Sequence, residues 1–252
     1  MRNHGRRIQL GPKLRMLVTA LLTADGFTLT AERLRDRLWN SNQGDTAMVT
    51  LRSHVSHLRR AFAVAGQPAA PDREILATEK LGDGQTAYRL VIPPERLDSR
   101  RLGRLVTSGR RALQAGSYET ACGKFADALS LWRGDPYPDA AGQPFALAEI
   151  TRLKDLQLIA RTGRAEAEIA LGNHREVVSE LQALATEYPY HGEIHTLLIH
   201  SLNRSKRIIE ASQAARTAVQ AGLDWGLDDR ALTRLQQDLL RGTLAMSGPL
   251  SA

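Results

Sequence analysis

The stretch from Asp45 to Ala63 constrains the chain most, because its pattern predicts a single helix with two faces of opposite character. Its apolar residues recur at three- and four-residue steps and form one stripe, which consists of Met48, Leu51, Val55, Leu58 and Phe62. A helix with one apolar stripe is stable when that stripe is buried in a core. The fold must therefore cover one side of this helix and leave the other side open.

The other side of this predicted helix carries hydroxyl, imidazole and guanidinium groups, and no carboxylate follows Asp45. A turn of about 100° per residue places opposite the stripe Thr46, Thr50, Ser53, His57 and Arg60, with Ser56 beside them and Arg52 and Arg59 nearer its edge. Such a face suits a nucleic-acid groove, because Arg donates to guanine edges, Ser and Thr reach bases or phosphates, and no carboxylate repels phosphate. An ordinary solvated helix face is also polar, so the flanking sequence has to decide between the two interpretations.

The chain is basic, and its excess of positive charge lies mainly in the part that contains this helix. Its 252 residues are enough for two ordinary domains and carry a net charge of +7. Residues 1–98 hold 15 Lys and Arg against 10 Asp and Glu, a net +5, whereas the other 154 residues hold 19 against 17, a net +2. A basic balance favours a polyanionic partner over an acidic substrate, although many unrelated proteins are also basic.

Cysteine usage and hydropathy indicate the cellular compartment of the protein. A single cysteine, Cys122, excludes an intramolecular disulfide and a thiolate metal cluster. The sequence has no run of 18 apolar residues, and residues 1–10 lack the apolar segment of a signal peptide. We therefore expect a soluble protein of the reducing cytoplasm, without a membrane partner and bound to the nucleoid when it holds DNA.

Before and after the central helix, the sequence predicts two more helices and a β-hairpin. The helices are expected at residues 12–24, where Pro12 takes the first helical position, and at 31–39, where Thr30 caps the start. Strands are expected at residues 6–10, 75–78 and 87–92, and the loop between the last two contains Gly82-Asp83-Gly84. Three helices followed by a hairpin are typical of a winged helix, whose third helix enters the major groove.

Beyond two prolines at 93 and 94 the pattern becomes entirely helical, which predicts an all-α second domain. Gly116, Tyr118, Ala121, Phe125 and Ala128 match the second half of a tetratricopeptide repeat. The pattern recurs in weaker form from Gly172 and again from Lys206, and these two positions are 34 residues apart, the period of that repeat. Stacked helical repeats bind protein segments, so we expect an interaction surface here. A plain helical bundle that only dimerises is the alternative.

The sequence predicts no catalytic, metal or cofactor site. Cys122 follows a small residue of the repeat pattern, as a packing residue would, and no His–Asp pair accompanies it. His54 and His57 face different directions around their helix, and no cysteine or carboxylate completes a ligand set. Gly82-x-Gly84 is not followed by the Lys and Ser or Thr of a phosphate loop. We therefore expect a protein that is not an enzyme.

Several segments together resemble a known family. Residues 14–22, 34–39, 51–60 and the closing Thr78 with 88–90 resemble the OmpR-type winged helix of the actinobacterial antibiotic-regulatory activators, the SARP family. Residues 131–139, 144–149 and 152–153 resemble the start of the bacterial transcriptional activation domain that follows it in that family. The family has several strands before its first helix, whereas here only residues 6–10 are expected to form one.

The resemblance implies a mainly α fold in two domains. It divides the chain into a winged-helix DNA-binding domain at 1–96 with a shortened N-terminal sheet, a tetratricopeptide-like activation domain at 97–242, and a disordered tail at 243–252. Thr78 and Lys80 match the wing positions that contact phosphate and the minor groove in the family. With the eight residues of the helix face given above, they complete the predicted DNA-binding set.

The resemblance also implies a function, which we state as a hypothesis. The chain is expected to activate transcription of a biosynthetic gene cluster for a secondary metabolite such as an antibiotic. It would bind direct repeats in double-stranded promoter DNA as a homodimer or as tandem protomers, and recruit RNA polymerase holoenzyme. A tetratricopeptide-type adaptor whose degenerate winged helix binds protein is the alternative. The carboxylate-free helix face and Lys80 favour DNA.

Overall fold

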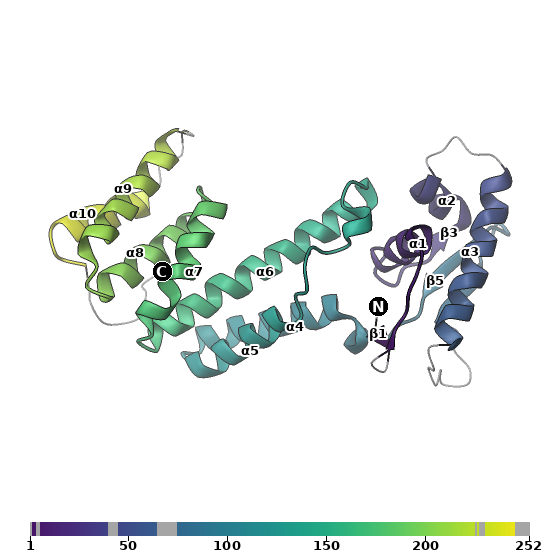
Figure 1. Ribbon diagram of the computed structural model, residues 1–252, viewed down its shortest axis with the longest axis horizontal. Helices are drawn as coiled ribbons and strands as arrows, with labels where there is room; N and C mark the ends of the chain where they lie inside the picture. Colours follow the sequence, from purple (N-terminus) through teal and green to yellow (C-terminus); the bar gives the residue numbers. More distant parts are fainter. Residues whose placement is uncertain are drawn as a thin grey trace. The chain divides into compact units, whose positions relative to one another are not determined.

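The computed structural model describes residues 2–3, 6–39, 45–64, 75–224, 226 and 230–244. Two compact units make up the chain, the first from residues 1–100 and 133–155 and the second from residues 101–132 and 156–252 (Figure 1). The fold is mainly helical, with a small antiparallel sheet in the first unit, as predicted. Among the described residues, no helix has the length and apolar character needed to cross a membrane.

The first unit contains the predicted winged helix. Helices α1 (Pro12–Leu22), α2 (Ala31–Trp39) and α3 (Asp45–Val64) come first in the chain. Strands β3 (Leu29–Thr30), β4 (Leu76–Lys80) and β5 (Thr86–Leu90) form an antiparallel sheet in the order β3-β5-β4. The centre of the core is made of fully buried leucines from both helices and sheet, namely Leu17, Leu34, Leu51, Leu58 and Leu76.

Local backbone chemistry sets the ends of these elements. Helix α1 ends two residues earlier than predicted, and Asp25 and Gly26 then turn the chain with φ of +54° and +84°. The hydroxyl of Thr30 accepts a hydrogen bond from the backbone N–H of Arg33 at 3.2 Å, which confirms the predicted cap of α2. Strands β4 and β5 reach closer to the loop between them than predicted. The reason is that the N–H of Leu81 donates to the carbonyl of Gln85 at 3.0 Å and prolongs the pairing.

The N-terminal strand prediction was wrong in extent. Residues 8–10 are not in a strand, and instead strand β2 (Arg6–Arg7) pairs with a further strand, β1 (Arg2–Asn3). Ile8 and Leu10 pack against the core of the winged helix, so they leave the hairpin to cover apolar surface. Of the predicted tail, residues 245–252 lie outside the described residues.

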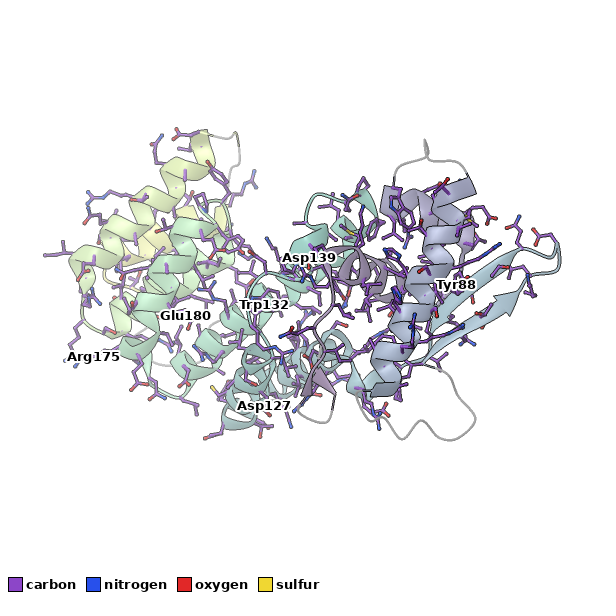
Figure 2. All side chains as sticks on the ribbon, turned by 45° about the vertical axis from the view of Figure 1, so that its right-hand side comes forward. Tyr88, Asp127, Trp132, Asp139, Arg175 and Glu180 are labelled. Atoms are coloured by element: carbon purple, nitrogen blue, oxygen red, sulfur yellow. The ribbon has the colours of Figure 1, made fainter. Side chains whose placement is uncertain are left out.

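A segment from beyond the predicted domain boundary completes the first unit. It comprises residues 133–155, with a short 3₁₀ helix η2 (Pro138–Ala140) and the start of helix α6 (Pro144–Ala170). Arg15 of α1 donates hydrogen bonds from Nε and Nη2 to the two carboxylate oxygens of Asp139 at 2.7 and 2.8 Å, and Figure 2 shows Asp139 beside α1. This contact lowers the pKa of Asp139. The guanidinium of Arg37 lies 5.2 Å from the ring centroid of Phe145.

Apolar side chains of the same segment extend the core. Ala140, Ala146 and Ile150 are buried and form a cluster with the partly buried Met16 and Phe145. Burial also raises the pKa of Tyr137 in this cluster to about 12. The division of the chain at residue 96 stays a prediction, but the winged helix has part of its apolar surface covered by residues well beyond that position.

The second unit is entirely helical in its described residues. It holds the later part of α6 and helices α4 (Asp98–Gln114), whose first turn belongs to the other unit, α5 (Tyr118–Ser130), α7 (His174–Glu187), α8 (Gly192–Arg204), α9 (Ile208–Asp224) and α10 (Arg230–Leu240). The ring of Phe125 lies between Gly109 and Gly163, where an added Cβ would come within 2.7 and 2.6 Å of it. Only glycine allows this close approach of three helices.

The predicted repeat positions share one turn geometry. Gly116, Gly172 and Lys206 have φ of +69°, +92° and +62°, the left-handed conformation that ends a helix. At each, the N–H donates to the carbonyl three residues back, and the next N–H donates to the carbonyl five residues back. The same turn therefore recurs at the positions that the sequence pattern picked out, although Lys206 lacks the glycine that such a turn favours.

The cover of α1 can be tested at Phe145. Replacing Phe145 by Ala removes a half-buried ring, so we expect the free energy of unfolding of the first unit to fall by about 1–3 kcal/mol. Leu147→Ala, on the same helix but 57% exposed, is the matched control and should change little. Native-state hydrogen exchange of the α1 amides in the full chain measures the effect. Equal protection in both variants would contradict it.

Candidate nucleic-acid interface

The predicted apolar stripe of α3 is buried, and this fixes the rotation of the helix about its axis. Leu51, Val55, Leu58 and Phe62 are at most 5% exposed, and Met48 is partly buried against the same core. Tyr88 of the sheet belongs to this core and is marked in Figure 2. Burial of one stripe obliges the opposite side of α3 to face outward.

The outward side carries most of the residues predicted to bind DNA. Exposed on it are Thr46, Arg52, Ser53, Ser56, His57 and Arg60. Within the described part of the chain, none of the last five side chains has a hydrogen-bond or ion-pair partner. Hydroxyl, imidazole and guanidinium donors are therefore available together on one helix face, and such groups bond to base edges and phosphates.

The side chains of Thr50 and His54, one turn apart on α3, both bond to backbone carbonyls of the same helix. The hydroxyl of Thr50 donates to the carbonyl of Thr46 at 2.9 Å, and His54 Nδ1 lies 2.9 Å from the carbonyl of Thr50. The rings of His54 and Trp39 pack in a T-shaped arrangement with centroids 5.8 Å apart. Thr50 was predicted as a DNA contact, and its hydroxyl is less available than those of Ser53 and Ser56.

Arg59, also predicted as a DNA contact, joins α3 to the wing. Its Nε and Nη2 donate to the backbone carbonyl of Leu76 at 3.1 and 2.9 Å, and Nη2 donates to the hydroxyl of Thr78 at 2.7 Å. Leu76 is buried at the start of β4. The guanidinium therefore holds the strand that leads into the wing against the helix. This contact could not be predicted from the sequence, because an Arg on a helix edge has no fixed partner.

The wing places its basic residue on the side of the sheet that faces α3. Thr78 pairs with Tyr88 and Lys80 pairs with Thr86 across β4 and β5. Because side chains alternate along a strand, Thr78 and Lys80 share a face with the buried Leu76. Both are exposed, and Lys80 Nζ donates to the hydroxyl of Thr86 at 2.8 Å. The turn that follows is formed by Gly84 at a φ of +79°.

The other side of the wing holds a carboxylate that sequence reasoning did not use. Glu79 accepts hydrogen bonds from the hydroxyl of Thr28 and from Arg89 Nε, both at 2.7 Å. These bonds, the one from Thr28 first, lower the pKa of Glu79. Alternation along β4 puts this charge on the face opposite Lys80. The described wing strands thus keep their carboxylate away from the side where phosphate would approach.

A further residue of the α3 face was missed in the sequence analysis. Val49 is 64% exposed and lies four residues before Ser53. The signal was present, since an apolar residue outside the stripe interrupts the polar face of the predicted helix. Polar groups alone had been predicted as DNA contacts, and an apolar side chain can also contact a base.

Metal ligands and the single cysteine were the other candidate site residues of the chain. In the described residues, no three His, Cys, Asp or Glu side chains are grouped to hold a metal ion. Burial raises the pKa of the Cys122 thiol to about 11, with Glu168 as a further cause. A thiol with such a pKa stays protonated at neutral pH and is a poor nucleophile.

Two family descriptions match this chain and divide it between them. Residues 5–82 match the family described as "Transcriptional regulatory protein, C terminal". Residues 97–240 match the family described as "Bacterial transcriptional activator domain". The first match covers helices α1 to α3 and the first strand of the wing, and the second covers the helical repeats.

Similar proteins are known from actinobacteria. The regulatory protein DnrI of Streptomyces peucetius is 30% identical over 205 residues, which are 80% of this chain and 73% of DnrI. The transcriptional regulatory protein EmbR of Mycobacterium tuberculosis is 34% identical over 229 residues, 88% of this chain but only 56% of EmbR. A solved structure of EmbR in complex with a low-affinity phosphopeptide superposes with a TM-score of 0.83 at 31% identity, over 96% of this chain and 62% of that one.

The joint between α3 and the wing can be tested at Arg59. Arg59→Ala removes donors from the carbonyl of buried Leu76, so we expect the free energy of unfolding to fall by about 1–3 kcal/mol. Arg60→Ala, at the next position but exposed, serves as control and should leave stability unchanged. Urea unfolding of both variants measures the difference. The joint would be refuted if the two substitutions had the same effect on stability.

Proposed function

The chain belongs to the SARP family of bacterial transcriptional regulators, in which an OmpR-type winged helix precedes a bacterial transcriptional activation domain, and we propose that it activates a biosynthetic gene cluster. It does so by binding direct repeats in promoter DNA. The names of its relatives support regulation in general, since DnrI is a regulatory protein and EmbR a transcriptional regulatory protein.

One observation carries the DNA-binding part. Helix α3 has its apolar stripe buried and presents on its opposite side a row of exposed donors without a carboxylate among them. A helix that lies in the major groove needs such a surface, because base edges there carry acceptors at guanine N7 and O6 and phosphates line both sides.

We assign the residues of the interface to two tasks. Ser53, His57 and Arg60 read base edges, because they are exposed on the side of α3 opposite the buried stripe. Thr46, Arg52 and Ser56 on the same face, Thr50 beside them, and Lys80 and Thr78 in the wing position the protein on phosphates. Arg59 acts through Leu76 and Thr78, and holds helix and wing together.

The second unit supplies the contacts to protein partners in this proposal. Its helices belong to the family of bacterial transcriptional activator domains, and its turns recur as in helical repeats. Such stacks bind other polypeptides along their faces. We propose RNA polymerase holoenzyme as that partner, with two protomers bound in tandem or as a homodimer on the DNA. The proposed activation domain spans residues 97–242.

Selection from a pool of random duplexes by the purified chain tests the function. We expect the selected sequences to contain direct repeats with centres about 10–10.5 bp apart, one turn of the duplex. Inserting about half a turn between the repeats puts the second half-site on the other side of the helix, so cooperative binding should be lost in a gel-shift series.

Other outcomes of that selection would point elsewhere. Inverted repeats, or binding that is indifferent to spacing, would refute the tandem arrangement. Recovery of no preferred sequence would favour the adaptor hypothesis, in which the winged helix binds protein.

A further inference from the structure

Val49 is the only large apolar side chain that is exposed among the described residues of α3. It is 64% exposed, whereas the apolar residues of the stripe, Met48, Leu51, Val55, Leu58 and Phe62, pack on the core. Single apolar residues occur on many protein surfaces and mean nothing by themselves. The position of Val49 on the helix is what suggests a function for it.

Val49 lies in the middle of the surface that would enter the groove. Val49, Ser53, Ser56 and Arg60 follow one another at steps of four, three and four residues, which keeps them on one face of a helix. Val49 is in the second turn of α3, and the N-terminal part of a recognition helix is the part that contacts base edges. The side chain would therefore meet bases, provided that α3 lies in the major groove.

Nothing in the described residues explains an apolar group at this place. The residues three and four positions away along the helix are Asp45, Thr46, Arg52 and Ser53, so no apolar side chain of α3 adjoins Val49 on this face. Valine is also a poorer helix former than alanine, so helix stability does not favour it here. An isolated apolar side chain among hydrogen-bonding groups fits a partner surface that is polar and has one apolar spot.

We propose that Val49 contacts the 5-methyl group of a thymine in the major groove and so reads one A·T base pair of the operator. The thymine methyl is the apolar group that base pairs present in that groove. The inference rests on the proposed function, because it requires α3 to bind DNA. It adds to that function a recognition step that does not depend on hydrogen bonds.

Replacing thymine by uracil tests the contact, because this change removes the methyl group and leaves base pairing intact. Each thymine of a selected duplex is replaced in turn by deoxyuridine, and the dissociation constant is measured for the full chain and for Val49→Ala. We expect one thymine in each half-site at which the replacement weakens the wild-type chain about fourfold, the effect of one buried methyl group. The same replacement should not affect Val49→Ala.

Leu147→Ala is the control, since it shortens an exposed apolar side chain outside α3 and should keep the full uracil effect. Circular dichroism checks that both variants fold. The proposal is overturned if Val49→Ala retains the fourfold loss, because another residue then contacts the methyl group. It is also overturned if no thymine replacement weakens the wild-type chain. If the wild-type chain bound no duplex at all, that result would instead refute the proposed function.

Discussion

Burial of the apolar stripe of α3 is the constraint on which the interface depends. Leu51 and Leu58 are fully buried among side chains of α1, α2 and the sheet. Side chains of this size contribute about 1.5–3 kcal/mol each when they are removed from water. Rotating α3 by one residue would expose such groups and bury arginine or serine in their place. The core therefore decides which residues of the helix face outward, and hydrogen bonding on the outer face has no part in that choice.

A second set of contacts holds the wing strand β4 to the structure around this core. Arg59 fastens β4 to α3, and Glu79 fastens the opposite side of the same strand to Thr28 and Arg89. The lowered pKa of Glu79 means that its charged form is stabilised by folding. This contribution is present above the ordinary pKa of 4.5 and is lost as the pH falls through the lower folded value.

The sequence predicted the parts of the molecule that depend on local periodicity. The stripe of α3, the cap at Thr30 and the recurring turns at Gly172 and Lys206 follow from spacing within one element, so a single chain reveals them. Contacts between distant positions were not predicted, because nothing in the spacing links Arg15 to Asp139, 124 residues away. The same holds for Arg59, whose partners are selected by the packing of helix on sheet. The ten predicted DNA contacts stay predictions, with most of them exposed and Arg59 and Thr78 joined to each other.

The most direct test compares Arg60→Ala with Lys80→Ala on a selected operator and on random duplex DNA. If Arg60 donates to a guanine, its loss should cost about 1–3 kcal/mol on the operator and little on random DNA. Lys80→Ala should weaken binding to both alike and reduce the slope of log affinity against log salt by about 1, because the contact with DNA that it removes is to a phosphate. Equal weakening of both duplexes by Arg60→Ala would contradict the assignment of this helix face to base reading.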